Sequence, residues 1–75
     1  MLEKVIEVIA DQLNMDASKI KGESSLVEDL KADSLDVAAL MLELEEEYNV
    51  EILEEDLAAL RTVNDITNYI QKKVG

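Results

Sequence analysis

The chain has 75 residues, of which 48% are hydrophobic, and it carries a net charge of −11 at pH 7 with no histidine, cysteine or proline. This length and composition predict one small folded domain, residues 1–75, rather than a disordered segment. Without histidine no Ser-His-Asp triad can form, and without cysteine disulfides and thiolate metal sites are excluded, so we predict no catalytic residues. Counted from Asp29, the acidic segment lacks the donor pattern of an EF-hand loop, so we predict no dedicated metal site, and loose association of divalent ions with the acids stays open.

The first predicted helix runs from about Leu2 to Leu13, because apolar residues recur there at helical spacing. Its stripe consists of Leu2, Val5, Ile6, Ile9 and Leu13. Acidic residues interrupt every turn, so neither a signal peptide nor a membrane span is expected, and the predicted location is cytoplasmic.

A long connection follows, from about Asn14 to Ala32. Connections of this length in a compact domain are usually functional or firmly held in place. The connection contains four apolar residues that we expect to anchor it: Ile20, Leu26, Val27 and Leu30.

A second helix is predicted from Ser34 to about Tyr48, with Asn49 as its stop. Either Asp33 or Ser34 can cap it, and Asp36 complements the positive end of its dipole. At ~100° per residue, one stripe suits a core contact: Val37, Leu40, Met41, Leu44 and Tyr48. The opposite face is also apolar: Leu35, Ala38, Ala39 and Leu42. A chain this short has too few elements to cover both faces, so the second face is predicted to dock partners.

The last third of the chain predicts a short third helix in residues 54–60 and a fourth helix that ends near Lys73. Thr62 and Asp65 have the spacing of a capping box at the start of the fourth helix. Its apolar residues share one stripe: Val63, Ile66, Ile70 and Val74. The predicted fold class is therefore all-α, a small four-helix bundle with three main helices, a short third helix and a long loop between the first and second helices.

Acidic residues are concentrated in the middle of the chain. Residues 28–56 contain twelve acids and one base, Lys31, and so carry the whole net charge of −11. Such a field repels nucleic acid and anionic membranes and accelerates encounters with basic protein surfaces. For an acidic run considered alone, a solubilising surface is the simpler interpretation.

A set of residues spread over the chain carries a family resemblance. The set is Leu30, Ala32 to Asp36, Leu40, Leu44 to Tyr48, Glu51, Ile52, Glu55, Asp56, Thr62, Val63, Asp65, Ile66, Tyr69 and Ile70. In order, spacing, length and acidity it resembles the acyl carrier proteins of bacterial type II fatty acid synthesis, over essentially the whole domain.

The resemblance implies that Ser34 carries a covalent phosphopantetheine arm, supplied from coenzyme A by a phosphopantetheinyl transferase, and that Asp33 assists this modification. It implies a non-catalytic, monomeric carrier that holds acyl chains as thioesters and presents them to fatty acid synthesis enzymes with basic docking surfaces. The implied partner-binding residues are Leu35, Asp36, Ala38, Leu42, Glu45 and Glu46.

Three positions depart from the family pattern. Lys31 stands where glycine is common, Ala39 where an acid is frequent and Leu53 where proline is often found. The first two change charges that partners would meet, so a carrier of a specialised polyketide or secondary pathway is an alternative. A second alternative is an unmodified acidic interaction module in which Ser34 is only a helix cap.

Overall fold

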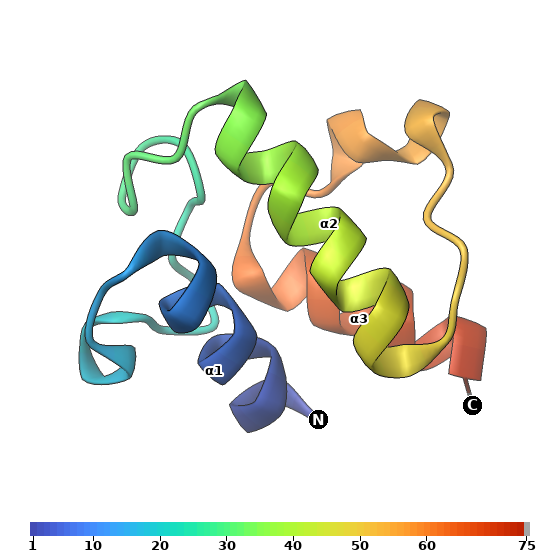
Figure 1. Cartoon of the computed structure of the whole chain (residues 1–75), viewed down its shortest axis with the longest axis horizontal. Coiled ribbons are helices and arrows are strands. Elements are labelled where there is room, and N and C mark those ends of the chain that lie inside the picture. The colour runs from blue at the N-terminus through green and yellow to red at the C-terminus, as the bar shows by residue number, and fades with distance from the viewer. Residues whose placement is uncertain (75) are drawn as a thin grey trace.

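The computed structural model describes residues 1–74 and contains three α-helices and two short 3₁₀ helices in that range (Figure 1). In chain order they are α1 (Leu2–Leu13), η1 (Ala17–Lys19), α2 (Ser34–Tyr48), η2 (Glu54–Ala59) and α3 (Val63–Val74). The all-α prediction is confirmed. The described residues form no strand, only one isolated antiparallel bridge between Ser25 and Thr62.

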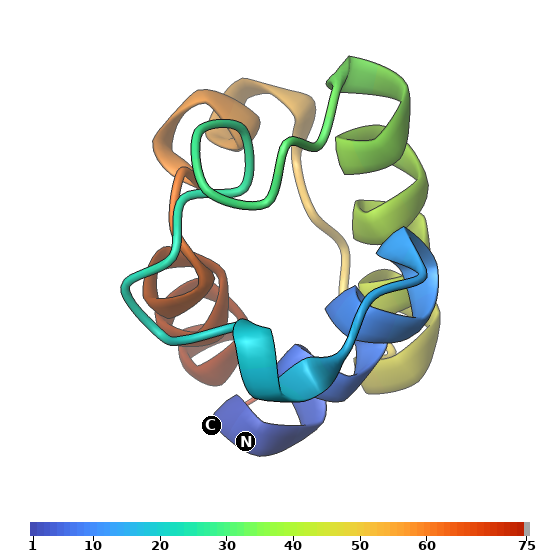
Figure 2. The ribbon, with the colours of Figure 1, turned by 90° about the vertical axis from the view of Figure 1, so that its left-hand side faces the viewer.

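The core lies where α1 packs against both α2 and α3, and Figure 2 shows the long loop closing one end of this arrangement. Three α-helices and the loop contribute its fully buried side chains: Val5, Ile9, Leu26, Leu40, Leu44, Val63, Ile66 and Ile70. The predicted core stripe of α2 is confirmed, with Val37 and Tyr48 half-buried at its edges.

Three residues predicted to be apolar anchors or stripe members are instead exposed. Leu2 and Val74 lie in the terminal turns of α1 and α3, where no neighbouring element covers them, and 36% and 47% of their surfaces are accessible. Val27 is 62% exposed, although Leu26 beside it is buried. The spacing of apolar residues in a helix or loop does not reveal which of them a neighbouring element covers.

Two short elements also differ from the sequence prediction. The third helix is a 3₁₀ helix that buries none of its six residues. Residues 17–19 of the connection form η1, where the Ser18 backbone N–H donates to the Asp16 carboxylate at 3.1 Å. This backbone hydrogen bond stabilises the ionised carboxylate and lowers the pKa of Asp16 below its ordinary value.

The long loop is held against the first turn of α3 and the residue Arg61 shortly before it, as its apolar anchors suggested. Backbone hydrogen bonds of 2.7–3.1 Å join Asn64 N–H to Gly22, Leu26 N–H to Arg61, and Val63 N–H to Ser24. Gly22 approaches Asn64 so closely that a Cβ would overlap the Asn64 side chain. Because Ile20, Leu26 and Leu30 are buried as well, the loop delivers the chain to a fixed starting point for α2.

Candidate functional site at the start of α2

The first turn of α2 is closed by a capping box made of two aspartates. Asp33 is the N-cap, and its Oδ1 accepts the Asp36 N–H at 2.9 Å, while Asp36 Oδ2 accepts the Asp33 N–H at 3.3 Å. Of the two residues that the sequence offered as the cap, Asp33 is the one used. Ser34 is left exposed at the first helical position.

The Ser34 hydroxyl makes no hydrogen bond to any described residue. Its backbone N–H and that of Leu35 likewise have no protein partner within residues 1–74. Free N–H groups at the positive end of a helix dipole favour an anionic group such as a phosphodiester. The position therefore combines an accessible nucleophilic oxygen with donors for a phosphate.

The backbone conformation of Lys31 explains why glycine is common at this position in the family. Lys31 has φ 59°, in the left-handed region, while Ala32 next to it is 3% exposed. Glycine adopts that backbone conformation without the steric cost that a side chain incurs. Lys31 also places a base three residues before Ser34, in a segment that is otherwise acidic.

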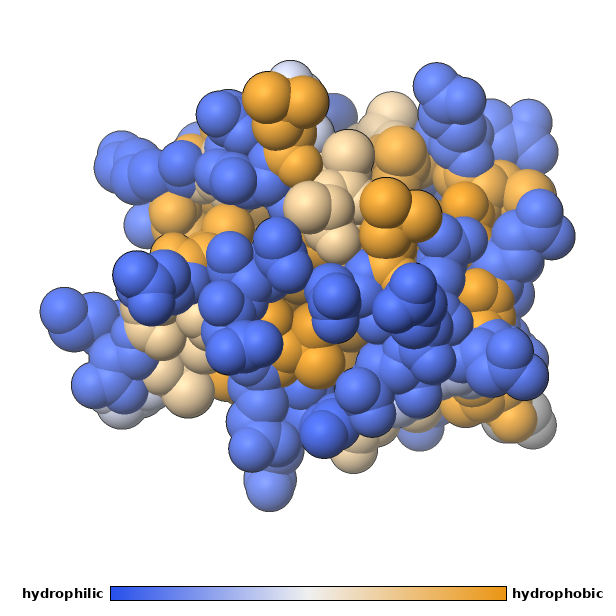
Figure 3. Space-filling view, in the orientation of Figure 1, coloured by the Kyte–Doolittle hydropathy of each residue, from blue (hydrophilic) through white to orange (hydrophobic). Residues whose placement is uncertain are grey.

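The face of α2 that points away from the core is apolar and open to solvent. Leu35 is 78% exposed and Leu42 is 62% exposed, and Ala38 between them is also exposed. Figure 3 shows apolar side chains over α2 surrounded by hydrophilic ones. The expectation that the second face of this helix is uncovered is confirmed for Leu35, Ala38 and Leu42, whereas Ala39 is half-buried.

The acids assigned to this face have different surroundings. Glu46 is exposed, whereas Asp36 and Glu45 are half-buried, and each of these two accepts a backbone hydrogen bond. Glu45 Oε2 accepts the Ile52 backbone N–H at 2.8 Å. Helical periodicity did not indicate this contact, because the two residues are seven positions apart and Ile52 lies beyond the end of α2.

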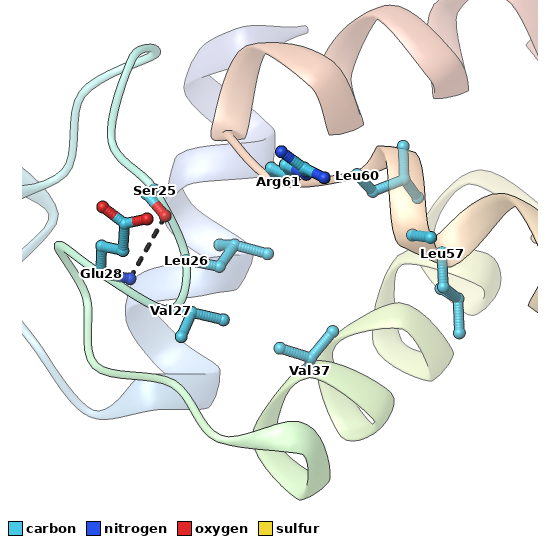
Figure 4. Close-up of a pocket in the computed structure, with 9 residues that line it drawn as sticks. Ser25, Leu26, Val27, Glu28, Val37, Leu57, Leu60 and Arg61 are labelled. Atoms are coloured by element: carbon cyan, nitrogen blue, oxygen red, sulfur yellow. Dashed lines mark hydrogen bonds between the residues drawn. The ribbon is translucent and has the colours of Figure 1, made fainter.

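An apolar groove of about 410 Å³ runs beside Ser34, between α2 and η2. It continues into a second hollow toward Leu60 and Arg61, shown in Figure 4, where Val27, Val37 and Leu57 converge from three segments. The two hollows share four residues: Val27, Val37, Leu57 and Ala58. Val27 was predicted to be buried, and no local pattern in the sequence indicated that its side chain is exposed and lines this groove.

Comparisons with known proteins agree with this geometry. The sequence pattern of the phosphopantetheine attachment site family matches residues 3–70. The acyl carrier protein of Thermosynechococcus vestitus is 49% identical over 75 residues, which cover 100% of this chain and 93% of the relative. That of Clostridium acetobutylicum is 48% identical over 71 residues, which cover 95% of this chain and 92% of the relative.

The chain belongs to the acyl carrier protein family. Its fold is similar to the solved structure of the acyl carrier protein from Enterococcus faecalis, with a TM-score of 0.79, 33% identity, and coverage of 96% of this chain and 91% of that one. As in the rest of the family, the domain is a phosphopantetheine attachment domain and the chain is a carrier. None of the helices in residues 1–74 is long and apolar enough to cross a lipid bilayer.

Proposed function

We propose that this acyl carrier protein bears its phosphopantetheine arm on Ser34. The observation that carries the proposal is that Ser34 is exposed at the first position of α2 and that its hydroxyl is not hydrogen-bonded to any residue the structure describes. A phosphodiester formed there would meet the free N–H groups of Ser34 and Leu35. When bound, the arm supplies a thiol that holds acyl groups as thioesters.

A phosphopantetheinyl transferase would perform the modification, with coenzyme A as the donor. The chain itself has no histidine to activate the serine, so it is a substrate of that enzyme and has no catalytic residue of its own. Asp33 supports the reaction by fixing the first turn through its bond to Asp36 and by placing a carboxylate next to Ser34.

The exposed face of α2 would receive the transferase and the enzymes of fatty acid synthesis. Its apolar centre suits a small contact and its acids suit basic docking surfaces, which raise association rates more than final affinity. The proposed docking residues are Leu35, Asp36, Ala38, Leu42, Glu45 and Glu46. A monomeric, cytoplasmic carrier leaves this face free for each enzyme in turn.

The groove between α2 and η2 would shelter part of an attached acyl chain. It begins at Ser34 and its walls are largely aliphatic, which supports an apolar occupant delivered from that residue. Each methylene group of the acyl chain that the groove buries would stabilise the sheltered state by about 0.8 kcal/mol. A carrier for a specialised pathway shares all these features. The rates at which fatty acid synthesis enzymes turn over the loaded carrier would distinguish a fatty acid carrier from a specialised one.

Intact-mass analysis tests the attachment site. After incubation with coenzyme A, Mg²⁺ and a phosphopantetheinyl transferase, the chain should gain the mass of one phosphopantetheine, and Ser34→Ala should gain none. Ser18→Ala, which removes another exposed serine hydroxyl, is the matched control and should be modified normally. Absence of a mass gain in the unaltered chain would instead support an unmodified acidic interaction module.

A further inference from the structure

The two walls of the groove are anchored very differently. Val37 and Ala38 belong to α2, which is packed into the core through Leu40, Met41 and Leu44, whereas Leu57 and Ala58 belong to η2. No residue of η2 is buried, and Leu57 is its only half-buried apolar side chain in contact with the core. Leu60, directly after η2, is buried in the core, so apolar burial fixes the end of η2 but contributes little along its six residues.

Side-chain hydrogen bonds hold η2 and the segment before it instead. Glu45 of α2 accepts the Ile52 N–H at 2.8 Å, just before η2. From α3, Tyr69 Oη donates to Asp56 Oδ2 at 2.6 Å and lies 3.4 Å from the Leu53 N–H. Short hydrogen bonds to carboxylates are among the stronger ones in proteins.

The Tyr69 ring is itself held in position. The Lys73 ammonium group lies 5.2 Å from the ring centroid, within the range of a cation–π interaction. Tyr69 is half-buried and joins the edge of the core, so the hydroxyl that reaches Asp56 projects from a packed base. Side chains from two packed helices, α2 and α3, thus hold η2, none of whose six residues is buried.

We propose that Glu45 and Tyr69 are positioning residues that hold η2 against the groove and thereby set which acyl chains the carrier shelters. This inference rests on the proposed function, because it takes the occupant to be an acyl chain delivered from Ser34. Loss of either hydrogen bond lets η2 move away from α2, which exposes the chain and its thioester. An acetyl group buries too little apolar surface to depend on the wall, so only longer chains respond.

Hydroxylamine cleavage of the loaded carrier tests this dependence. Unaltered chain, Glu45→Ala and Tyr69→Phe are each loaded with acetyl or octanoyl phosphopantetheine, and the rate of thioester loss is followed by intact mass. Both variants should raise the octanoyl rate about fivefold, the factor equivalent to about 1 kcal/mol for one net hydrogen bond, and leave the acetyl rate unchanged. Glu45→Gln keeps an acceptor oxygen without the charge and should restore the slow rate.

Matched controls separate the tethers from general effects of substitution. Tyr48→Phe removes a phenol hydroxyl that has no hydrogen-bond partner in residues 1–74, and Glu43→Ala removes an exposed acid of α2. Both should cleave like the unaltered chain. Equal acceleration of acetyl and octanoyl cleavage in the tether variants would indicate general loosening of the fold, and no acceleration would show that the tethers do not set the groove. Either result overturns the proposal.

Failure of the proposed function is distinguishable from failure of this inference. If Ser34 takes no arm, no thioester forms, and the tethers are then tested by amide hydrogen exchange on the unmodified chain. Tyr69→Phe should increase exchange at Asp56 N–H, which donates to Leu53 within the first turn of η2 at 2.9 Å, while Tyr48→Phe should not. Unchanged exchange in Tyr69→Phe would refute the tether.

Discussion

Helices α2 and α3 begin with the same capping device but differ in the residue that follows the cap. In α2 the box joins Asp33 to Asp36, and in α3 Thr62 and Asp65 exchange hydrogen bonds, both at 3.1 Å. The first helical residue of α3 is Val63, which is fully buried, whereas that of α2 is the exposed Ser34.

The outer faces of the two helices differ in the same way. In α3 the apolar residues are collected on one stripe, and Val63, Ile66 and Ile70 are fully buried. In α2 a second apolar face remains outside, with Leu35 78% exposed. Capping and core packing account for Val63, Ile66 and Ile70 of α3, but they leave Ser34 and the outer face of α2 without a structural task. These are the features on which the proposed carrier function rests.

Deleting core volume from α3 should have the largest effect on stability. Ile66→Ala should lower the free energy of unfolding by about 2–5 kcal/mol, because it leaves a cavity in a fully buried site. Leu42→Ala on the outer face of α2 should change it by at most about 0.5 kcal/mol. Urea unfolding followed by circular dichroism measures both, and equal losses would remove the distinction between the two helices.

Substituting the first residue of each helix tests the difference between the buried Val63 and the exposed Ser34. Val63→Ser should destabilise the fold by about 1–3 kcal/mol, since it places a hydroxyl in a buried position. Ser34→Val should leave the midpoint of thermal unfolding almost unchanged while abolishing the mass gain with coenzyme A. A large stability loss in Ser34→Val would show that Ser34 has a structural role.

The two tyrosines provide a matched pair of hydroxyl deletions. Tyr69→Phe should cost about 1 kcal/mol because its hydroxyl is hydrogen-bonded to Asp56. Tyr48→Phe should be neutral or slightly stabilising, because the buried Tyr48 hydroxyl has no partner among the described residues. Chemical denaturation at pH 7 compares them, and a greater loss for Tyr48→Phe would contradict the assigned contacts.

The stability that depends on Tyr48 should fall at alkaline pH. Burial, with the charges of Glu47 and Glu7, raises the pKa of Tyr48 above its ordinary value. The unfolded chain therefore releases this proton first, so the contribution of Tyr48 to stability is complete below pH ~10 and is lost as pH rises through the folded-state pKa. Above pH ~10, the unfolding free energy of Tyr48→Phe should therefore decline less steeply with pH than that of the unaltered chain.

The smallest expected effect concerns the turn that leads into α2. Lys31→Gly should stabilise the fold by about 0.5–1 kcal/mol, because glycine tolerates a φ of 59°. Lys31→Ala, which removes the same charge but retains a Cβ, should give no such gain. Equal unfolding midpoints for the two variants would indicate that the Lys31 charge, and not its backbone conformation, determines the difference.

Local patterns predicted the helices well because their signals lie within a few residues of one another. The capping box at Thr62, the stop at Asn49 and the core stripe of α2 all depend on contacts across one or two helical turns. The outer face of α2 could be predicted as well, since a short chain has too few elements to cover it. The likeness of residues around Ser34 to a known family then indicated the candidate site.

The sequence by itself determined the all-α class, the helix boundaries of α1, α2 and α3 to within about two residues, and the candidate serine. Only the tertiary structure decided that Val27 lines a groove, that η1 interrupts the long loop, and that Glu45 and Tyr69 hold η2. The reason is physical: hydrogen bonds and apolar contacts between residues far apart in the chain depend on how whole helices pack, and no periodicity within one segment encodes them.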